Sequence, residues 1–374
     1  MLTAAENRHY SRHLLLKELG PSGQEKLKSS SVLIIGCGGL GCPAATYLAA
    51  AGIGRITLID PDTVDESNLH RQVAFTAADV GAPKAEVLAA RLRANNPYIH
   101  ISARQERFQL DNAAELVSSH DLVVDGSDNF PTRYLANDAC FFAKRPLVFG
   151  AIHQFSAQLS LFNAAPSLPC YRCLFPEPPD AGSIPNCDEA GVLGVLPGLC
   201  GSLMASEAVK FLAGIGTSLA GQVLTCDLLQ NQFQSFKLPR DPSCPLCGQQ
   251  ASIHHLSELN WSCTSKSSPE IEISPSQLQQ EIESGQALCL LDVRETWEFS
   301  SVAIAGSINI PLGQVPQNLD KLPRDLPIRC ICHHGVRSLK ARELLAAAGF
   351  TNVRSLQGGV DLWADEIDMD MPKY

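Results

Sequence analysis

The pattern of apolar and polar positions over residues 31–150 predicts strands and helices in alternation. Residues 32–35 are four apolar residues in a row, three of them β-branched, which is typical of a strand buried on both faces. An alanine-rich run over residues 44–51 then predicts a helix. Further strands separated by helices are predicted at residues 56–60, 99–102, 121–125 and 146–150. Such alternation predicts a mostly parallel α/β sheet with helices on both faces.

The pattern changes twice further along the chain. Residues 157–162 and 221–236 alternate as antiparallel strands do, so we expect a mixed sheet. A polar, serine-rich stretch then predicts a linker, and a second α/β pattern follows it. We therefore predict three parts: a first domain, a linker and a smaller α/β domain, at residues 1–248, 249–270 and 271–374.

Composition narrows the class of protein. Among the 374 residues, 45% are hydrophobic and 18% are charged, as in an ordinary globular protein. The formal net charge of -10 argues against a nucleic-acid partner. No apolar run is expected to reach the length of a membrane span, and the polar N-terminus has no signal-peptide core. We therefore expect a cytoplasmic protein without a membrane partner, in which the 14 cysteines serve metal or thiol chemistry rather than disulfides.

The glycines after the first predicted strand indicate a nucleotide site. Gly36, Gly38 and Gly41 fit the pattern G-x-G-x-x-G between a strand and a helix. Such glycines let the backbone turn tightly and approach a phosphate, which then faces the helix N-terminus. Asp60 ends the next strand, where a carboxylate reaches ribose hydroxyls. This combination predicts a Rossmann-like sheet, and the alternative for the motif is a tight turn without a ligand.

Charged and amide side chains gather around the same predicted sheet edge. An enzyme that handles a triphosphate needs cations for the phosphates and an acid for Mg²⁺. Arg71 and Lys84 suit the first role and Asp128, at a strand end, suits the second. Taken singly, each residue is more often a surface charge. Together with Asn68 and Gln72 they are better explained as one site.

Two C-x-x-C pairs predict a structural metal centre. The first is Cys170 with Cys173, and the second is Cys244 with Cys247. Four thiolates favour tetrahedral Zn²⁺, and a filled four-sulfur site leaves no open position for catalysis. Either pair alone could instead be a redox dithiol.

A third constellation begins at Cys332, where a strand runs into a turn and a helix. A sulfur in that position faces several inward N–H groups, and with Arg337 nearby the loop is expected to stabilise an anion. The alternative is a buried cysteine at a strand end. His333 and His334 are interpreted as residues lining the loop rather than as metal ligands.

Residues 1–248 resemble the MoeB/ThiF family, bacterial relatives of the ubiquitin-activating enzymes. The motifs that carry the resemblance stand at residues 10–12, 36–42, 60–64, 68–72, 81–84, 125–129 and 194–210, together with both cysteine pairs. The resemblance implies ATP- and Mg²⁺-dependent adenylation of the C-terminal glycine of a ubiquitin-like sulfur carrier that ends in Gly-Gly.

The family also implies roles for individual residues. The glycine turn, including Gly39, would hold ATP, Asp60 would bind ribose, and Asp128 would hold Mg²⁺. Asn68, Arg71 and Lys84 would contact phosphates. Arg12 would reach the ATP of a neighbouring subunit, which implies a homodimer.

Residues 271–374 resemble a rhodanese domain. The matching stretches are residues 292–295, 306–311, the loop at Cys332, and 356–363. By this likeness Cys332 carries a persulfide that it receives from a donor such as a cysteine desulfurase. Ala303 departs from the histidine that this family often has before the second of these stretches, which we interpret as tuning of the activity.

Cys187 lies in a segment where relatives of the first domain place a cysteine that bonds covalently to the carrier. The alternative is an incidental loop cysteine. The resulting hypothesis is a fused adenylyltransferase and sulfurtransferase, foremost for molybdopterin synthesis, with thiamine synthesis, tRNA thiolation and cysteine synthesis left open. An NAD-dependent oxidoreductase and a non-catalytic scaffold for a ubiquitin-like protein are the rivals from other classes.

Overall fold

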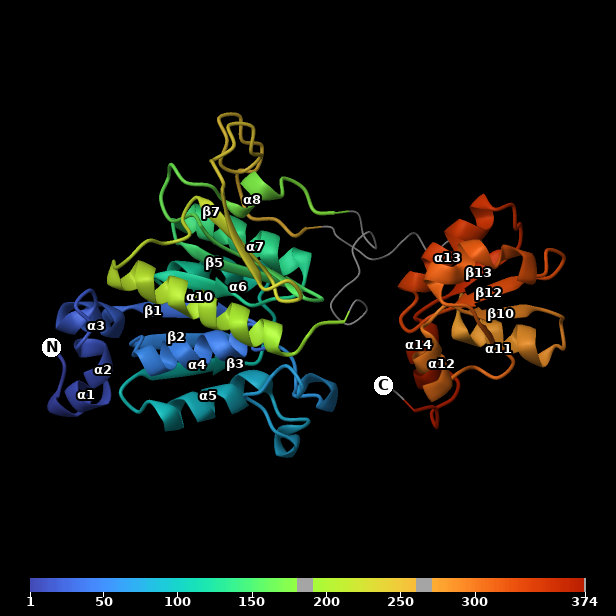
Figure 1. Ribbon diagram of the computed structural model, residues 1–374, viewed down its shortest axis with the longest axis horizontal. Helices are drawn as coiled ribbons and strands as arrows, with labels where there is room; N and C mark the ends of the chain where they lie inside the picture. Colours follow the sequence, from blue (N-terminus) through green and yellow to red (C-terminus); the bar gives the residue numbers. More distant parts are fainter. Residues whose placement is uncertain (180–190, 260–270, 373–374) are drawn as a thin grey trace. The chain divides into compact units, whose positions relative to one another are not determined.

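The computed structural model describes residues 1–179, 191–259 and 271–372 (Figure 1). The chain divides into two compact units, and the boundary between them falls within the predicted linker. Each unit is built around its own sheet.

The first unit contains an eight-stranded sheet in the order β3-β2-β1-β4-β5-β6-β7-β8. Strands β1 to β5 run parallel where they pair, and β6, β7 and β8 continue the sheet in antiparallel fashion. The mixed, mostly parallel sheet predicted from the sequence is confirmed. The strand bounds are β1 Ser31–Ile35, β2 Arg55–Ile59, β3 His100–Arg104, β4 Leu122–Asp125, β5 Leu147–His153, β6 Ser156–Phe162, β7 Gln222–Asp227 and β8 Gln232–Lys237.

Helices cover both faces of this sheet (Figure 1). The central strand β1 shows why, because Val32 and Ile34 pack into one core with α4, α5 and α10, and Leu33 and Ile35 pack into the other with α6 and α7. The helix bounds in this unit are α1 Ala4–His9, α2 Ser11–Leu14, α3 Gly20–Ser29, α4 Gly41–Ala51, α5 Lys84–Asn95, α6 Leu110–Ser118, α7 Phe130–Ala143, α8 Tyr171–Leu174 and α10 Val195–Ala213, with 3-10 helices at Glu66–Asn68 and Ala77–Asp79.

Helix α10 is an exception to the expectation that no apolar run is long enough to cross a membrane. It is 19 residues long with a mean hydropathy of 1.3, which suffices by length and composition. It packs against α4, β5 and β6, and Met204 and Ala208 on its inner face are fully buried. Its apolar composition is therefore partly that of a core helix, although Val195 at its start remains 63% exposed.

The beginning of the predicted linker packs against the first unit. Ile253 contacts the cluster of four cysteines, and Leu256 and Leu259 pack against the core that contains α6 and α7. These apolar residues extend the packed part of the first unit beyond the second C-x-x-C pair as far as Leu259.

The second unit is a smaller parallel sheet in the order β11-β10-β12-β13-β9. Two buried clusters lie on its two faces, so it also has helices on both sides. The strands are β9 Glu272–Ile273, β10 Cys289–Asp292, β11 Ile308–Asn309, β12 Ile328–Ile331 and β13 Val353–Leu356. The helices are α11 Pro275–Glu283, α12 Thr296–Ser301, α13 Val336–Ala347 and α14 Gly359–Glu366, with 3-10 helices at Leu312–Gln317 and Leu319–Lys321.

Candidate functional site

The glycine turn lies at the carboxyl end of β1, between β2 and β4 in the sheet. Gly36 has φ +87°, a conformation that residues with a side chain rarely adopt. A Cβ at Gly41 would lie 1.8 Å from the Gly36 carbonyl oxygen, so the helix can approach the strand only without one. The turn therefore has the shape that lets backbone N–H groups face a phosphate.

Asp60 holds this turn in place. One carboxylate oxygen accepts a 2.6 Å hydrogen bond from the Cys37 N–H, and the other accepts a 2.8 Å bond from the Asp62 N–H. Burial raises the pKa of Asp60, and these backbone bonds oppose that rise. Each oxygen keeps a second acceptor position, so the carboxylate can both brace the turn and accept a hydroxyl.

A cavity opens above the turn and gathers most of the predicted nucleotide site. Lys84 is buried, with its Nζ 3.2 Å from a carboxylate oxygen of Asp62. Gln72 is also buried, and its Oε1 has no hydrogen-bond partner within the described part of the chain. The predicted residues that line the cavity are Gly36, Gly38, Gly39, Asp60, Arg71, Gln72, Lys84 and Asp128.

Three predicted residues do not line this cavity. Gly41 is the first residue of α4 and packs against the turn from below. Asn68 ends a 3-10 helix, and its side chain bonds the Ser67 hydroxyl. Arg12 is exposed on α2.

The cavity also contains residues that sequence reasoning missed. Arg107 and Phe108 reach it from the loop after β3, and Arg133 reaches it from the first turns of α7. The Arg133 guanidinium donates to the Ser127 carbonyl oxygen at 3.1 Å. Arg133 could have been predicted from the sequence, because it lies five residues after Asp128 on the helix that follows this loop. Arg107 and Phe108 could not have been predicted, because their place depends on β3 pairing with β2.

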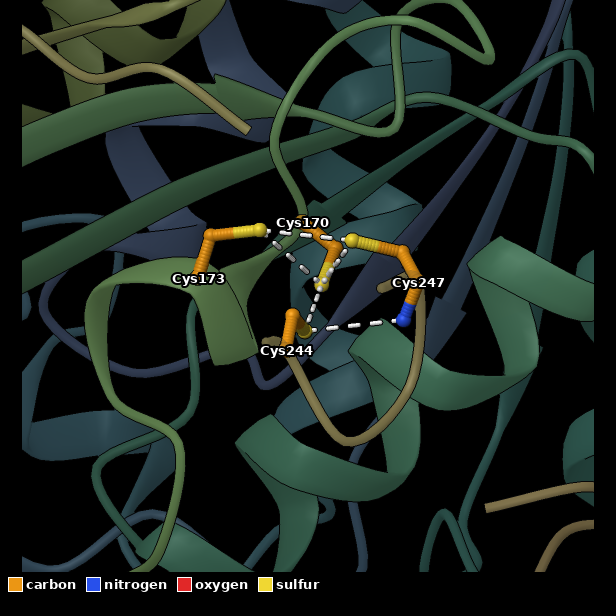
Figure 2. Close-up of side chains that lie close together, drawn as sticks. All are labelled: Cys170, Cys173, Cys244 and Cys247. Atoms are coloured by element: carbon orange, nitrogen blue, oxygen red, sulfur yellow. Dashed lines mark hydrogen bonds between the residues drawn. The ribbon is translucent and has the colours of Figure 1, made fainter. Parts of the chain in front are cut away.

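The four cysteines of the two C-x-x-C pairs converge, and Figure 2 shows their sulfurs pointing toward one another. Cys170 Sγ lies 3.9, 3.6 and 3.5 Å from the sulfurs of Cys173, Cys244 and Cys247, and the sulfurs of Cys173 and Cys247 are 3.3 Å apart. Tetrahedral zinc with bonds of about 2.3 Å requires sulfurs about 3.8 Å apart. The cluster therefore has the geometry to hold a metal ion.

The first cysteine pair is anchored to α7. Arg172, between its two cysteines, makes two 2.8 Å hydrogen bonds to the carboxylate of Asp138, and both side chains are buried. Asn137 accepts a 2.8 Å bond from the Tyr171 N–H. Helix α7 thus runs from the nucleotide cavity, where it carries Arg133, to the cysteine cluster.

In the second unit Cys332 follows β12 and is 1% exposed. The Gly335 N–H donates to its sulfur at 3.1 Å, and the Ser338 hydroxyl lies 3.3 Å from it. A Cβ at Gly359 would lie 2.3 Å from the carbonyl oxygens of Cys332 and His333. The loop is therefore closed against the start of α14 and surrounds the sulfur with donors.

Arg337 lies in this loop with its guanidinium on a carboxylate. Its two Nη atoms each donate a 2.7 Å hydrogen bond to Glu298 of α12. Glu298 also accepts a 2.8 Å bond from the Glu295 N–H. The ion pair therefore ties the loop to α12.

His333 and His334 form a group with Asp361 of α14, and their ligand-type atoms lie within 4.8 Å of one another. Burial, and then the neighbouring His334, lower the pKa of His333 to about 4. A neutral imidazole is also the form that binds a metal ion, so the interpretation of His333 and His334 as loop-lining residues stays a prediction. Cys187, the remaining predicted site residue, lies outside the described residues.

Two family models match the chain. One is described as the ThiF family and covers residues 10–246. The other is described as a rhodanese-like domain and covers residues 274–366. The nucleotide cavity and the cysteine cluster lie within the first match and the Cys332 loop lies within the second.

Curated relatives include proteins that match along their whole length. A probable adenylyltransferase/sulfurtransferase MoeZ of Mycobacterium tuberculosis is 40% identical over 378 residues, covering 100% of this chain and 96% of that protein. A sulfur carrier protein adenylyltransferase of Thermus thermophilus is 50% identical over 266 residues, covering 70% of this chain and 98% of that protein.

Among solved structures, MccB of Escherichia coli determined with ATP is similar to the first unit's fold. It is 26% identical with a TM-score of 0.56, and the match covers 66% of this chain and 75% of that one.

Proposed function

We propose that this chain, which belongs to the ThiF family and carries a rhodanese-like domain, acts on a ubiquitin-like sulfur carrier. In this proposal it converts the C-terminal glycine of the carrier into a thiocarboxylate. The chain is an adenylyltransferase and sulfurtransferase, as its full-length relatives are named. One observation carries the proposal. The same chain contains a glycine turn that can face a phosphate, with Lys84 beside it, and a loop that surrounds the Cys332 sulfur with hydrogen-bond donors.

In the first step the carrier carboxylate attacks the α-phosphate of ATP, and pyrophosphate leaves as the acyl-adenylate forms. Arg71 and Lys84 hold the phosphates, and the carboxylate of Asp60 accepts a ribose hydroxyl while its backbone bonds keep the turn shaped. Asp128, an exposed carboxylate at the cavity, is the ligand for Mg²⁺, which neutralises charge on the phosphates when bound. Gln72 offers its unpartnered Oε1 to a donor in the same cavity.

In the second step the terminal sulfur of a Cys332 persulfide attacks the acyl carbonyl, and AMP leaves. A thiol, either Cys187 or an external one, then attacks Cys332 Sγ, so that the S–S bond breaks and the thiocarboxylate leaves. A further external thiol reduces the mixed disulfide that remains on Cys332 and returns Cys332 to its thiolate. The sulfur on Cys332 comes from a persulfide donor, for which a cysteine desulfurase is our candidate. The bonds that the loop makes to the sulfur, from the Gly335 N–H and the Ser338 hydroxyl, suit a site that stabilises a sulfur anion.

The four-cysteine cluster is proposed to bind Zn²⁺ in a structural role. Its buried position, its anchoring to α7 through Arg172 and Asp138, and its sulfur spacing support this assignment. All four sulfurs are used, so the site joins distant parts of the first unit without taking part in the reaction.

A homodimer that shares its nucleotide sites is proposed next. Arg12 is exposed on α2 and does not line the cavity of its own chain. Apolar side chains are exposed on the same unit, with Leu15 76%, Tyr47 57% and Val195 63% accessible. We propose that a second copy covers them and supplies its own Arg12 to this cavity. A cytoplasmic location is proposed as well, because the free cysteines of the cluster and of the Cys332 loop suit a reducing compartment.

The test is ATP–pyrophosphate exchange with candidate carriers that end in Gly-Gly, followed by detection of the thiocarboxylate by mass. Carriers of the molybdopterin pathway are expected to serve best, with those for thiamine synthesis and tRNA thiolation as comparisons. Exchange that requires a carrier supports the proposal. Thermal stabilisation by NAD but not by Mg-ATP would favour an oxidoreductase, and binding of a carrier without exchange would favour a scaffold.

A further inference from the structure

Two buried hydroxyls form a chain that ends on the sulfur of Cys332. The Ser355 hydroxyl of β13 lies 2.7 Å from the Ser338 hydroxyl, which in turn lies 3.3 Å from Cys332 Sγ. Ser338 and Ser355 are both fully buried, and Cys332 is 1% exposed. Ser338 is in the first turn of α13, so three elements of the unit meet in this chain.

The hydroxyl of Ser338 has two acceptors but only one proton. It lies 2.9 Å from the Gly335 carbonyl oxygen and 3.3 Å from the sulfur, so it can donate to one of them at a time. Ser355 donates to Ser338 at 2.7 Å, and its other acceptor, the Gly335 carbonyl oxygen, is farther away at 3.4 Å. Ser355 thus occupies a lone pair of Ser338 and leaves the Ser338 proton free to turn.

We propose that this chain is a proton switch for the sulfur chemistry, with Ser338 acting on Cys332 and Ser355 acting as a positioning residue through Ser338. When the sulfur carries a proton, Ser338 donates to the Gly335 carbonyl oxygen. When the sulfur is an anion, the Ser338 hydroxyl turns and donates to it, and the bond from Ser355 polarises that hydroxyl. The inference rests on the sulfurtransferase part of the proposed function.

The switch serves both halves of sulfur transfer. In loading, the Cys332 thiolate attacks the outer sulfur of a donor persulfide R–S–SH. A new S–S bond forms, the donor S–S bond breaks, R–S⁻ leaves, and no net oxidation occurs. In delivery, the thiocarboxylate leaves when a thiol attacks Cys332 Sγ, and Cys332 leaves as a thiolate when a second thiol reduces the resulting mixed disulfide. Both steps pass through the anion that the turned Ser338 hydroxyl stabilises.

Other charged groups around the loop also influence how the reactivity of Cys332 depends on pH. Arg337 is ion-paired with Glu298 of α12, and burial keeps His333 neutral over most of the usual range by lowering its pKa to about 4. His334 and Asp361 of α14 lie beside His333. None of these is changed by substituting the two serines, so a shift in pH dependence can be assigned to the hydroxyls.

The experiment measures the rate at which iodoacetamide alkylates Cys332 in the full chain, as a function of pH, with the modified peptide identified by mass spectrometry. Ser338→Ala should move the midpoint of the profile upward by about one pH unit, which is about tenfold slower alkylation at neutral pH. Ser355→Ala should move it in the same direction by less, about threefold in rate. Ser355→Thr, which keeps a hydroxyl, should restore the original profile.

A matched control is Ser284→Ala, because the Ser284 hydroxyl also donates to a carbonyl oxygen but is exposed at the end of α11. It should leave the profile unchanged. Melting temperatures establish that each variant is folded, and Ser355→Gly replaces Ser355→Ala if the latter does not fold. A folded Ser355 variant without a hydroxyl that alkylates with the original profile overturns the role of Ser355, and an unchanged Ser338→Ala profile overturns the switch.

This assay needs neither carrier, ATP nor persulfide donor, so its outcome is separable from that of the proposed function. Transfer of sulfur from thiosulfate to cyanide by the unsubstituted chain tests the sulfurtransferase activity itself. An active chain whose serine variants have unchanged profiles contradicts only the switch, whereas a chain that does not transfer sulfur contradicts the proposed function.

Discussion

Arg337 and Glu298 form a two-pronged ion pair, in which each Nη donates a 2.7 Å hydrogen bond to one carboxylate oxygen. The side chains are 20% and 7% exposed. The pair joins the Cys332 loop to α12, whose first turn Glu298 also caps through the Glu295 N–H. The guanidinium that the sequence offers as an anion stabiliser therefore has a second task, which is to hold the loop in shape.

Glu298→Ala is expected to destabilise the second unit by about 3 kcal/mol, because it leaves the Arg337 guanidinium in a largely buried place without this carboxylate. Sulfur transfer from thiosulfate to cyanide should fall as well, since the loop loses its tie to α12. Urea unfolding followed by the fluorescence of the buried Trp363 measures the stability. Glu366→Ala, at an exposed position on α14, is the control. Equal stability of both variants would contradict this role for the pair.

Asp128→Ala is expected to reduce carrier-dependent ATP–pyrophosphate exchange by at least about 100-fold, because it removes the proposed carboxylate ligand of Mg²⁺. Its effect on Cys332 loading should be negligible, since that step uses no nucleotide. Asp111→Ala, an exposed carboxylate on α6, should leave both reactions unchanged. Retained formation of carrier adenylate in Asp128→Ala would refute the role in binding Mg²⁺.

Cys332→Ala is expected to do the opposite. Thiocarboxylate formation should disappear while pyrophosphate release persists, because adenylation uses only the cavity at the glycine turn. Cys289→Ala, which removes a buried thiol from β10 outside the loop, is the matched control for losing a cysteine. If pyrophosphate release also vanished in Cys332→Ala, the proposed division of labour between the two domains would be wrong.

Local patterns predicted the fold well where a segment's environment is set by its own sequence. The four apolar residues of β1 were expected to be buried on both faces, and they divide between the two cores of the first unit. The glycine turn was likewise readable, because the need for glycine at Gly36 and Gly41 comes from the backbone of the turn itself.

Features that depend on distant segments could not be predicted in the same way. Arg107 and Phe108 enter the nucleotide cavity because β3 lies beside β2 at the far side of the glycine turn, an arrangement that no local pattern encodes. The partner of Arg337 was hidden for the same reason, since Glu298 comes from a different helix. The length of the apolar helix α10 was also not predicted. Three small residues and a proline in its first turns interrupt the apolar pattern, although the helix itself is continuous.

Loss of the proposed zinc ion is expected to destabilise the first unit by several kcal/mol, because the four-cysteine cluster joins α8 to the segment that follows β8. In calorimetry, Cys173→Ser or prolonged chelation should lower the melting temperature of the first unit. The melting temperature of the second unit should not change. Metal analysis should find one equivalent of zinc in the unsubstituted chain. Cys226→Ala, a buried cysteine of β7 outside the cluster, should keep its zinc. A zinc-free chain of unchanged stability would contradict the structural role.

The second unit is expected to lose stability as the pH falls from about 6.5 toward 4. Burial lowers the pKa of His333 to about 4, whereas histidine in the unfolded chain titrates near 6.5. Between these values the unfolded chain binds a proton that the folded unit does not, so acid favours unfolding there, and the contribution is fully present only above about 6.5. His333→Gln should therefore flatten the dependence of stability on pH in this window, as measured by urea unfolding with Trp363 as the reporter. His255→Gln, at an exposed position in the first unit, should leave the dependence unchanged. A His333→Gln chain with the original slope would mean that another group takes up the proton.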